Sequence, residues 1–462
     1  MKRTGLRPYP RCATRHLSGF IRRVITLAFI ASPGLADSPA DIQHPPPHMG
    51  EAKLLEVGKG WAANSVNAAV FRTDPITTWK DQQFVAYYNA DSRVVIATRT
   101  LGNTTWTPTV TALTGNTKDA HNVISIIADG EGYLHLSWDH HGHPLRYVKS
   151  VAPGFTEFTK NIPMTGLFEN NVTYPQFFKL ANGNLIFLYR DGSSGRGNLA
   201  LNHYDTKAQT WTQIHSNFIS GENQRNAYPQ STVDAKGSIH VSWVWRESGD
   251  VATNHDVCYA RSDDGGKTWC KSDGTSYALP ITLATAEIAA RVPQKHELIN
   301  QTSMCTDSDG HPIIATYFRP SGSPVPQFFV IAHDGKTWRT TQVSTRTTLF
   351  SLSGEGSKAI PISRPQVLAK SADGKTSVSV IYRDLERGSK VTVSQCADLR
   401  SDKWTTRDLT EFGVRFWEPS YDHIRWERDG ILNLFVQSTG QGDGEQLEAI
   451  EPQPVFVLEW LP

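Results

Sequence analysis

The sequence predicts an all-β fold and, within that class, a seven-bladed β-propeller. The first observation is a repeat: a glycine-containing turn, an alternating apolar strand and an aromatic pair ending in a polar residue recur about every 53 to 73 residues. The second is composition, since 35 Gly, 26 Pro and 10% aromatic residues suit many short strands joined by turns. The third is that each unit has room for four short strands of half-buried sheet. Such units stack radially in a propeller and leave only short sheet edges exposed.

Six copies of the repeat are marked by their turns. The strand after each turn alternates apolar and polar residues, as in EGYLHLSWDHH after the first and SIHVSWVWRES after the third. A seventh copy, QQFVAYYNADSRVVIATR, begins at Gln82 and lacks the turn. The last strand, residues 454–460, is expected to pair with a strand near residues 67–72 and close the ring. The six turns are Asp129-Gly130, Asn182-Gly183, Lys236-Gly237, Asp309-Gly310, Asp373-Gly374 and Asp429-Gly430.

Two further segments have the pattern of Asp-box turns, which occur between the strands of propeller blades. The stronger segment covers residues 262–269, SDDGGKTW, and the weaker one residues 333–338, HDGKTW. Both predict structural turns, and neither indicates an activity.

The first 36 residues predict a secretory signal peptide. They carry seven Lys or Arg and no acidic residue, an apolar run over residues 24–30, and small residues at Gly34 and Ala36. The apolar run is too short for a membrane anchor. We expect cleavage before Asp37 and a secreted or periplasmic protein without a membrane partner. Residues 37–462 would then form one monomeric catalytic propeller domain with a short N-terminal arm.

The charge balance excludes a strongly basic nucleic-acid binder. The formal net charge is +1, and the chain is net acidic once the signal segment is removed. No nucleic-acid partner is expected. An anionic ligand must therefore be held by a local cluster of arginine or lysine.

Arginines and histidines stand where several repeats end. Equivalent positions in neighbouring blades surround one axis, so these side chains are expected at one mouth of the channel. Converging guanidinium groups repel one another unless an anion lies between them, and their planar fork suits a carboxylate or a sulfate. Alternatively, each arginine pairs with a local acid, as Arg190 could with Asp191. The strand-end residues are Arg190, Arg246, Arg319 and Arg383, with His140 and His141 of the segment DHHGH.

Two histidines and two tyrosines extend this cluster. His121 opens one strand and His141 closes the next, so both can reach the same rim, and a neutral imidazole can accept a proton near pH 7. Tyr174 precedes Arg190 by one strand and a turn, and a neighbouring guanidinium would stabilise its phenolate. Tyr228 repeats the Tyr-Pro-Gln motif of Tyr174 in the next blade. DHHGH also permits a metal interpretation, although adjacent histidines on a strand point to opposite faces.

Four of the cysteines follow the signal segment, too few for a disulfide framework in a chain of this size. His255, Cys258 and Cys270 have spacing that suits zinc, with His296 as a fourth ligand. Such a Zn²⁺ would be structural, and no cofactor is expected for catalysis. The alternatives are one disulfide or two free thiols.

Three long segments resemble the BNR-repeat polysaccharide lyases, in particular the secreted ulvan lyases with seven blades. The resemblance covers about residues 60 to 440 and implies β-elimination at a uronate of an anionic polysaccharide. It places the family's histidine pair on His121 and His141, its tyrosine on Tyr174 and its carboxylate-binding arginine on Arg190. The segments are HNVISIIADGEGYLHLSWDHHGHPLRY, TYPQFFKLANGNLIFLYRDGSSGRGN and NHDVCYARSDDGGKTW with the AEIAARVPQKHELINQTSM that follows.

The residue chemistry agrees with this implication. Elimination needs a cation for the C6 carboxylate, a base for the C5 proton and an acid for the departing O4. Arg190 can supply the first, a histidine the second, and Tyr174 or the other histidine the third; the sequence leaves base and acid open. We assign substrate binding to Arg246, Arg319, His140 and Tyr228. Competing hypotheses are a lyase for unsulfated rhamnosyl-glucuronate glycans, a non-catalytic carbohydrate-binding propeller and a sialidase-like hydrolase.

Overall fold

The structure, a computed structural model, describes residues 50–462. The expected signal segment, residues 1–36, lies outside this range. The described chain is built almost entirely of β-strands, which confirms the all-β prediction; its α-helix is the single short segment α1 (His423–Asp429). Within the described residues, no helix is long and apolar enough to cross a membrane.

The strands form six hydrogen-bonded sheets, three of them simple four-stranded meanders. The first contains β2 (Ile76–Trp79), β3 (Gln82–Tyr88), β4 (Arg93–Thr100) and β5 (Thr107–Thr114). The second contains β18 (Ser303–Thr306), β19 (Pro312–Phe318), β20 (Gln327–His333) and β21 (Trp338–Gln342). The third contains β22 (Gln366–Ala372), β23 (Lys375–Arg383), β24 (Lys390–Cys396) and β25 (Trp404–Gly413).

The remaining sheets have three, nine and three strands. One three-stranded sheet contains β6 (Ile124–Ala128), β7 (Leu134–Trp138) and β9 (Tyr147–Lys149). The nine-stranded sheet contains β8 (His141–His143), β10 (Val172–Lys179), β11 (Leu185–Ser193), β12 (Arg196–Asp205), β13 (Thr210–Ser220), β14 (Asn226–Val233), β15 (Ile239–Arg246), β16 (Asn254–Ser262) and β17 (Glu287–Ala290). A single parallel pair, Gly197 with Asn226, joins its two antiparallel halves. Four single-turn 3₁₀ helices lie in loops: η1 (Val251–Thr253), η2 (Leu385–Arg387), η3 (Leu399–Ser401) and η4 (Asp443–Glu445).

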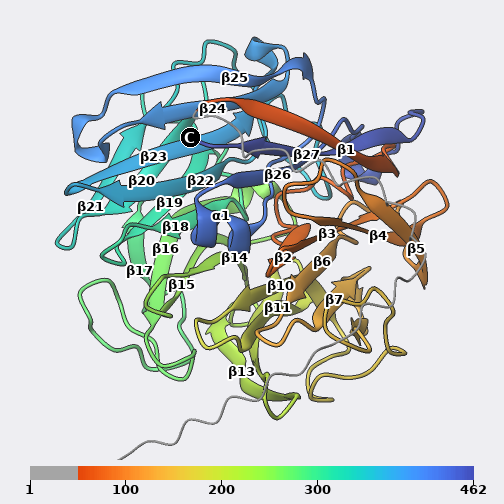
Figure 1. Cartoon of the computed structure of the whole chain (residues 1–462). Helices are drawn as coiled ribbons and strands as arrows, with labels where there is room; N and C mark the ends of the chain where they lie inside the picture. The colour runs from red at the N-terminus through yellow and green to blue at the C-terminus, as the bar shows by residue number, and fades with distance from the viewer. Residues whose placement is uncertain (1–49) are drawn as a thin grey trace, which may run out of the picture. The chain divides into compact units, whose positions relative to one another are not determined.

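The last sheet joins the two ends of the described chain. It contains β1 (Ala52–Gly60), β27 (Gln453–Trp460) and β26 (Leu432–Gln437), and β1 lies alongside β27 in Figure 1. The predicted partner of the last strand, residues 67–72, is therefore wrong. That segment forms turns because its side chains bond to neighbouring backbone: Asn67 to both backbone groups of Tyr88, and Arg72 to the carbonyls of Asn67 and Ile124.

The six predicted turns each lie directly before a strand, as the repeat predicts. Five of the six each join an antiparallel pair of strands and precede β7, β11, β15, β19 and β23, and four of those five have a glycine in the left-handed region, such as Gly183 at φ +86°. Gly130 instead lies against Gly183, where an added Cβ would come within 2.7 Å of backbone. The sixth differs, because Gly430 ends α1 before β26. The predicted Asp-box turn is present, with the Asp264 carboxylate accepting from the backbone N–H of Lys267 and Thr268.

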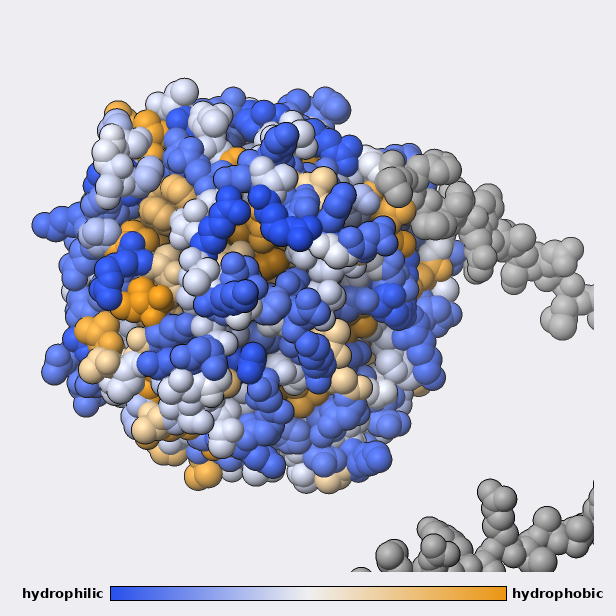
Figure 2. Space-filling model, turned by 90° about the vertical axis from the view of Figure 1, so that its left-hand side faces the viewer, coloured by the Kyte–Doolittle hydropathy of each residue, from blue (hydrophilic) through white to orange (hydrophobic). Residues whose placement is uncertain are grey.

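The core consists of apolar clusters that include side chains from neighbouring sheets. The largest joins the β1–β27–β26 sheet to the sheets of β2–β5 and β22–β25, around the fully buried Trp417 and Trp460. The face in Figure 2 is mostly hydrophilic, with scattered apolar groups. This packing fixes the strand ends from which the candidate site is built.

Candidate active site

Asp119 holds two histidines side by side. It lies between β5 and β6, and its carboxylate accepts from His121 Nδ1 at 2.9 Å and from His141 Nδ1 at 2.7 Å. The two imidazole rings are stacked, with centroids 4.0 Å apart and planes 17° from parallel. Because a carboxylate is only an acceptor, each Nδ1 carries a proton, and each Nε2 is left for a ligand.

The two rings carry different charges. Burial disfavours the cation at His121, but Asp119 and the Glu445 carboxylate, 3.2 Å from the same Nδ1, outweigh it and raise the pKa of His121 to about 9. Burial, together with the charges of His121 and Arg190, lowers the pKa of His141 despite its bond to Asp119. At neutral pH His121 is an imidazolium, and His141 is a neutral imidazole whose Nε2 can accept a proton.

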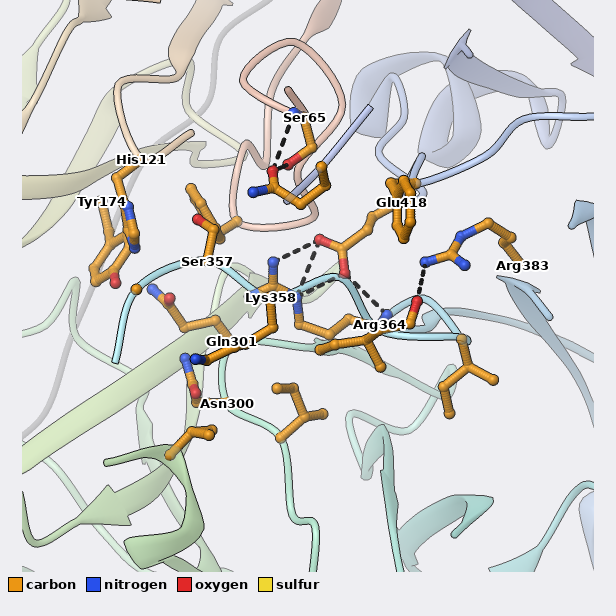
Figure 3. Close-up of a pocket in the computed structure, with 18 of the residues that line it drawn as sticks. Ser65, His121, Tyr174, Asn300, Gln301, Ser357, Lys358, Arg364, Arg383 and Glu418 are labelled. Carbon is orange, nitrogen blue, oxygen red and sulfur yellow. Dashed lines mark hydrogen bonds and ion pairs between the residues drawn. The ribbon is translucent and has the colours of Figure 1, made fainter. Parts of the chain in front are cut away.

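Tyr174 is aimed at these rings by an irregularity in β10. The register between β10 and β11 shifts between Thr173 and Gln176, and Tyr174 has a left-handed φ of +57°. Its ring lies 6.0 Å from that of His121, and Figure 3 shows the two side by side. Burial raises the pKa of Tyr174 and outweighs the neighbouring guanidinium groups. The expected stabilised phenolate is therefore wrong: Tyr174 is a neutral phenol, which suits a proton donor.

Arg190 is buried without a carboxylate partner. Its guanidinium carbon lies 4.9 Å from the centre of the Tyr174 ring, and Nη2 donates to Thr173 Oγ1 at 3.1 Å. Its Nε is buried with no acceptor, and no ion pair joins it to an acid within residues 50–462. The alternative pairing with Asp191 is thus not formed, because adjacent strand residues face opposite sides. An unpaired buried guanidinium is suited to receive an anion.

A second tyrosine–arginine pair repeats the first in the next strands. The guanidinium carbon of Arg246 lies 5.4 Å from the centre of the Tyr228 ring, and the Tyr228 hydroxyl contacts Ser194 Oγ at 2.8 Å. Burial would raise the pKa of Tyr228, but Arg246 and Arg190 outweigh it and lower that pKa. Arg246 also has a buried Nε without an acceptor.

These side chains line one cleft of about 400 Å³. The structure thus brings together six of the eight predicted catalytic and substrate-binding residues. Glycines and serines between the charged groups leave room for a polar ligand. The lining is His121, His141, Gly142, Tyr174, Arg190, Gly192, Ser193, Ser194, Tyr228, Arg246, Gly249, Glu355 and Gly356.

The other two predicted binding residues lie outside the cleft. His140 is fully buried, its Nε2 accepts from the backbone N–H of Arg146, and burial lowers its pKa to about 3. It precedes β8, which begins at His141, and its side chain is buried whereas that of His141 lines the cleft. Arg319 is bound to Glu297 at 2.6 Å and to the carbonyl of Lys295, so its charge is already compensated. Neither residue is placed to bind a ligand of the cleft.

The predicted zinc ligands do not converge. His255 is bound to Glu247 and Asp256, and His296 Nδ1 contacts the carbonyl of Arg319. Cys258 and Cys270 are free thiols, so the disulfide alternative is not formed either, and Cys258 is buried in an apolar cluster. The cause is the strand geometry, which directs Cys258 into the core. The residues present therefore do not fit a shared metal ion.

Two other groups of ligand-type atoms do cluster among the described residues. One is the set Asp119, His121 and His141, whose Nδ1 atoms already bond to the carboxylate. The other is Asp307, Asp309 and His311, at the turn before β19. There the Asp307 carboxylate accepts from the backbone N–H of Asp309 and His311. Internal hydrogen bonds account for both clusters.

Sequence reasoning missed both carboxylates that bind the histidine pair. Asp119 stands two residues before His121, and a signal existed in that spacing: an aspartate beside a histidine rim suggests a group that orients imidazoles. The sequence gave no signal for Glu445. Its carboxylate accepts a hydrogen bond from the backbone N–H of Ala120 at 3.0 Å, but the two residues are 325 positions apart in the chain. Only the tertiary fold brings η4 to this rim.

Fold and site together define a class: a β-sheet protein in which arginines without an acidic partner, tyrosines and a histidine pair line one cleft. A family model described as a BNR repeat-containing family member matches residues 82–346, and the chain belongs to this family.

Curated relatives in the comparison are ulvan lyases. The long isoform of Glaciecola sp. (strain KUL10) is 23% identical over 269 residues, which cover 45% of this chain and 27% of the relative. The short isoform of Alteromonas sp. (strain LOR) is 28% identical over 137 residues, 26% of each chain. The matched segment spans about a quarter of the length of these relatives.

Solved structures share the fold over most of the chain. The polysaccharide lyase Uly1 has a TM-score of 0.61 at 16% identity, with 84% of this chain and 90% of that chain covered. A PL25 ulvan lyase bound to -[GlcA(1-4)Rha3S]- has a TM-score of 0.62 at 14% identity, with 87% and 95% covered. At this identity the similarity establishes the fold.

Proposed function

We propose that this protein is a polysaccharide lyase that cleaves a uronate-containing anionic polysaccharide by β-elimination and leaves unsaturated uronyl ends. One observation carries the proposal: a neutral imidazole, a neutral phenol and an unpaired buried guanidinium line one cleft. These are the base, the acid and the carboxylate-binding cation that elimination requires.

For the roles that the sequence left open, our proposal rests on the protonation states. Arg190 binds the C6 carboxylate of the uronate and stabilises the charge that develops as the C5–H bond breaks. His141 Nε2 takes the C5 proton, because its lowered pKa keeps it neutral. The C4=C5 double bond forms as the C4–O4 bond breaks, and the Tyr174 hydroxyl gives its proton to O4. The His121 imidazolium and Asp119 hold His141 in position.

Ulvan is the substrate we favour, because the curated relatives and the structural neighbours include ulvan lyases. The unpaired Arg190 and Arg246 support a substrate with more than one acidic group. Unsulfated rhamnosyl-glucuronate glycans are the second candidate, and a non-catalytic carbohydrate-binding protein is the third. The experiment below distinguishes them.

We also propose a seven-bladed propeller in which the two halves of the nine-stranded sheet are separate blades. The single residue pair between those halves and the β1–β27 pairing support this arrangement. The signal-like composition of residues 1–36 supports export to the cell exterior or the periplasm. We also propose that the protein is a monomer.

The test is ultraviolet absorbance at the unsaturated-uronate band while the purified protein acts on ulvan. A conjugated uronate absorbs there, whereas a hydrolysis product does not. A rise that Arg190→Ala abolishes would support the lyase and its substrate. No rise with ulvan but a rise with unsulfated rhamnosyl-glucuronate would transfer the proposal to that substrate. No rise with either polymer, with binding retained, would leave a binding protein and refute the lyase.

A further inference from the structure

A second, deeper pocket adjoins the cleft. It has room of about 70 Å³ and shares His121, Tyr174, Arg246 and Gly356 with the cleft. That volume accommodates a few water molecules or one small polyatomic ion. Figure 3 shows Asn300, Gln301, Ser357 and Lys358 between the His121–Tyr174 end and the Arg364–Glu418 pair, with Arg383 beyond. The elimination proposed above uses none of these deeper residues.

The deeper pocket has an excess of positive charge. Besides the His121 imidazolium, which is paired with Asp119 and Glu445, four cationic side chains line it, and Glu418 is the single carboxylate of the lining. That carboxylate is already saturated: Arg364 binds it through Nε and Nη2, at 2.8 and 2.6 Å, and the backbone N–H of Val70 donates to it at 2.9 Å. The cations are Arg246, Lys358, Arg364 and Arg383.

The remaining cations have no acid of their own in the pocket. Arg383 donates to three backbone carbonyls, those of Ile360, Pro361 and Trp417. Lys358 makes no hydrogen bond or ion pair with any residue of 50–462; its charge acts on Asp250, whose carboxylate already accepts two backbone N–H groups. Unneutralised charges in a confined site favour an anion strongly.

Gln301 adds a donor that has no partner. Its side chain lines the pocket, the residue is 2% exposed, and neither its amide nitrogen nor its amide oxygen has a hydrogen-bond partner. Its backbone is held in the left-handed region at φ +55°. Buried amides are almost always paired, so this one points to a polar ligand within reach.

We propose that the deeper pocket is a binding site for a small oxyanion, of sulfate size, held by Lys358 and Gln301 beside the saturated Arg364–Glu418 pair. The tetrahedral oxyanion would accept from the Lys358 ammonium and the Gln301 amide and lie within the field of Arg383. It can come from two sources: free sulfate, or a sulfate ester on a saccharide in the adjoining cleft. The site itself does not depend on the proposed lyase activity.

Calorimetric titration of the purified protein with sodium sulfate at constant ionic strength tests the site. We expect saturable binding that Lys358→Met or Gln301→Met weakens by about tenfold or more, the cost of one charge-assisted hydrogen bond. Lys160→Met, at an exposed lysine outside both pockets, is the control for lost charge and should bind sulfate like the wild type. Unaltered thermal unfolding of each variant would show that the fold is intact.

Two further titrations identify the source of the anion. If a sulfate ester fills the pocket, inorganic sulfate competes with a sulfated ulvan oligosaccharide but not with its desulfated form, and Lys358→Met removes the competition. If the site takes free sulfate, both oligosaccharides bind independently of it. No saturable sulfate binding, or equal binding by the wild type and both pocket variants, would overturn the proposal and leave a water-filled pocket.

Discussion

The substitution Asp119→Asn tests the central arrangement of the site. It keeps the shape of the side chain but removes the charge shared by His121 and His141, and an amide cannot accept from both Nδ1 atoms. Hydrogen bonds to charged groups contribute about 1.5–3 kcal/mol each, so kcat/KM should fall by about a hundredfold or more. Progress curves at the unsaturated-uronate band measure this loss.

The same variant makes a prediction about stability. The pKa of His121 is raised from 6.5 to about 9, which corresponds to stabilisation on the order of 3 kcal/mol. A raised histidine pKa stabilises the fold fully below pH 6.5, and this contribution is lost as the pH rises through about 9. Urea unfolding should therefore show Asp119→Asn well below the wild type at pH 6, with the gap narrowing by pH 9.5.

Glu445→Gln is the matched control for that reasoning. It removes the second carboxylate at His121 Nδ1 and leaves the hydrogen bond between Asp119 and His141 in place. Glu445→Gln should therefore lose part of the stability that Asp119→Asn loses, and keep more activity than Asp119→Asn. Wild-type kcat/KM in Asp119→Asn, or a stability gap that does not change between pH 6 and pH 9.5, would refute the assigned charges.

Three other predictions concern residues at or near the site. Tyr174→Phe should abolish turnover on ulvan yet keep oligosaccharide binding within a few fold, because the ring and its contact with Arg190 remain; wild-type turnover would exclude the phenol as the acid. Prolonged treatment with a chelator should leave the melting temperature unchanged, since His255, Cys258 and Cys270 share no centre; a fall accompanied by zinc release would contradict this. Arg72→Met should lower the free energy of unfolding by about 3 kcal/mol, because three buried carbonyls lose their donor; a loss below about 1 kcal/mol in urea unfolding would show that those carbonyls find other partners.

The fold class and much of the site were accessible from the sequence because both follow a repeat. Recurring turns located the strands, and equivalent strand ends placed Arg190 and Arg246 in one cleft. The repeat also predicted the two tyrosines of the cleft, because Tyr174 and Tyr228 occupy matching positions in their repeats. Features that recur in each repeat can therefore be predicted from a single sequence.

The errors have separate physical causes. His140 and Cys258 were judged by their place along the chain, but both side chains are buried, that of Cys258 because it lies on the inward face of β16. Arg319 was judged by its place in the repeat, but its guanidinium forms an ion pair with the neighbouring Glu297. Glu445 could not be foreseen because its loop follows no repeat and reaches His121 only through the tertiary fold.

The pairing of β1 with β27 has a consequence for folding. Strands near opposite ends of the described chain must meet before the β26 sheet is complete, so its formation requires closing a loop that includes every other sheet. Until then Leu55 and Val57 of β1, and Val455 and Val457 of β27, lack their native neighbours. While the chain is still emerging from the ribosome, β1 is exposed without its partner, because β27 is synthesised last; the apolar edge of β1 is then a natural site for chaperone capture or for strand swapping with a second copy.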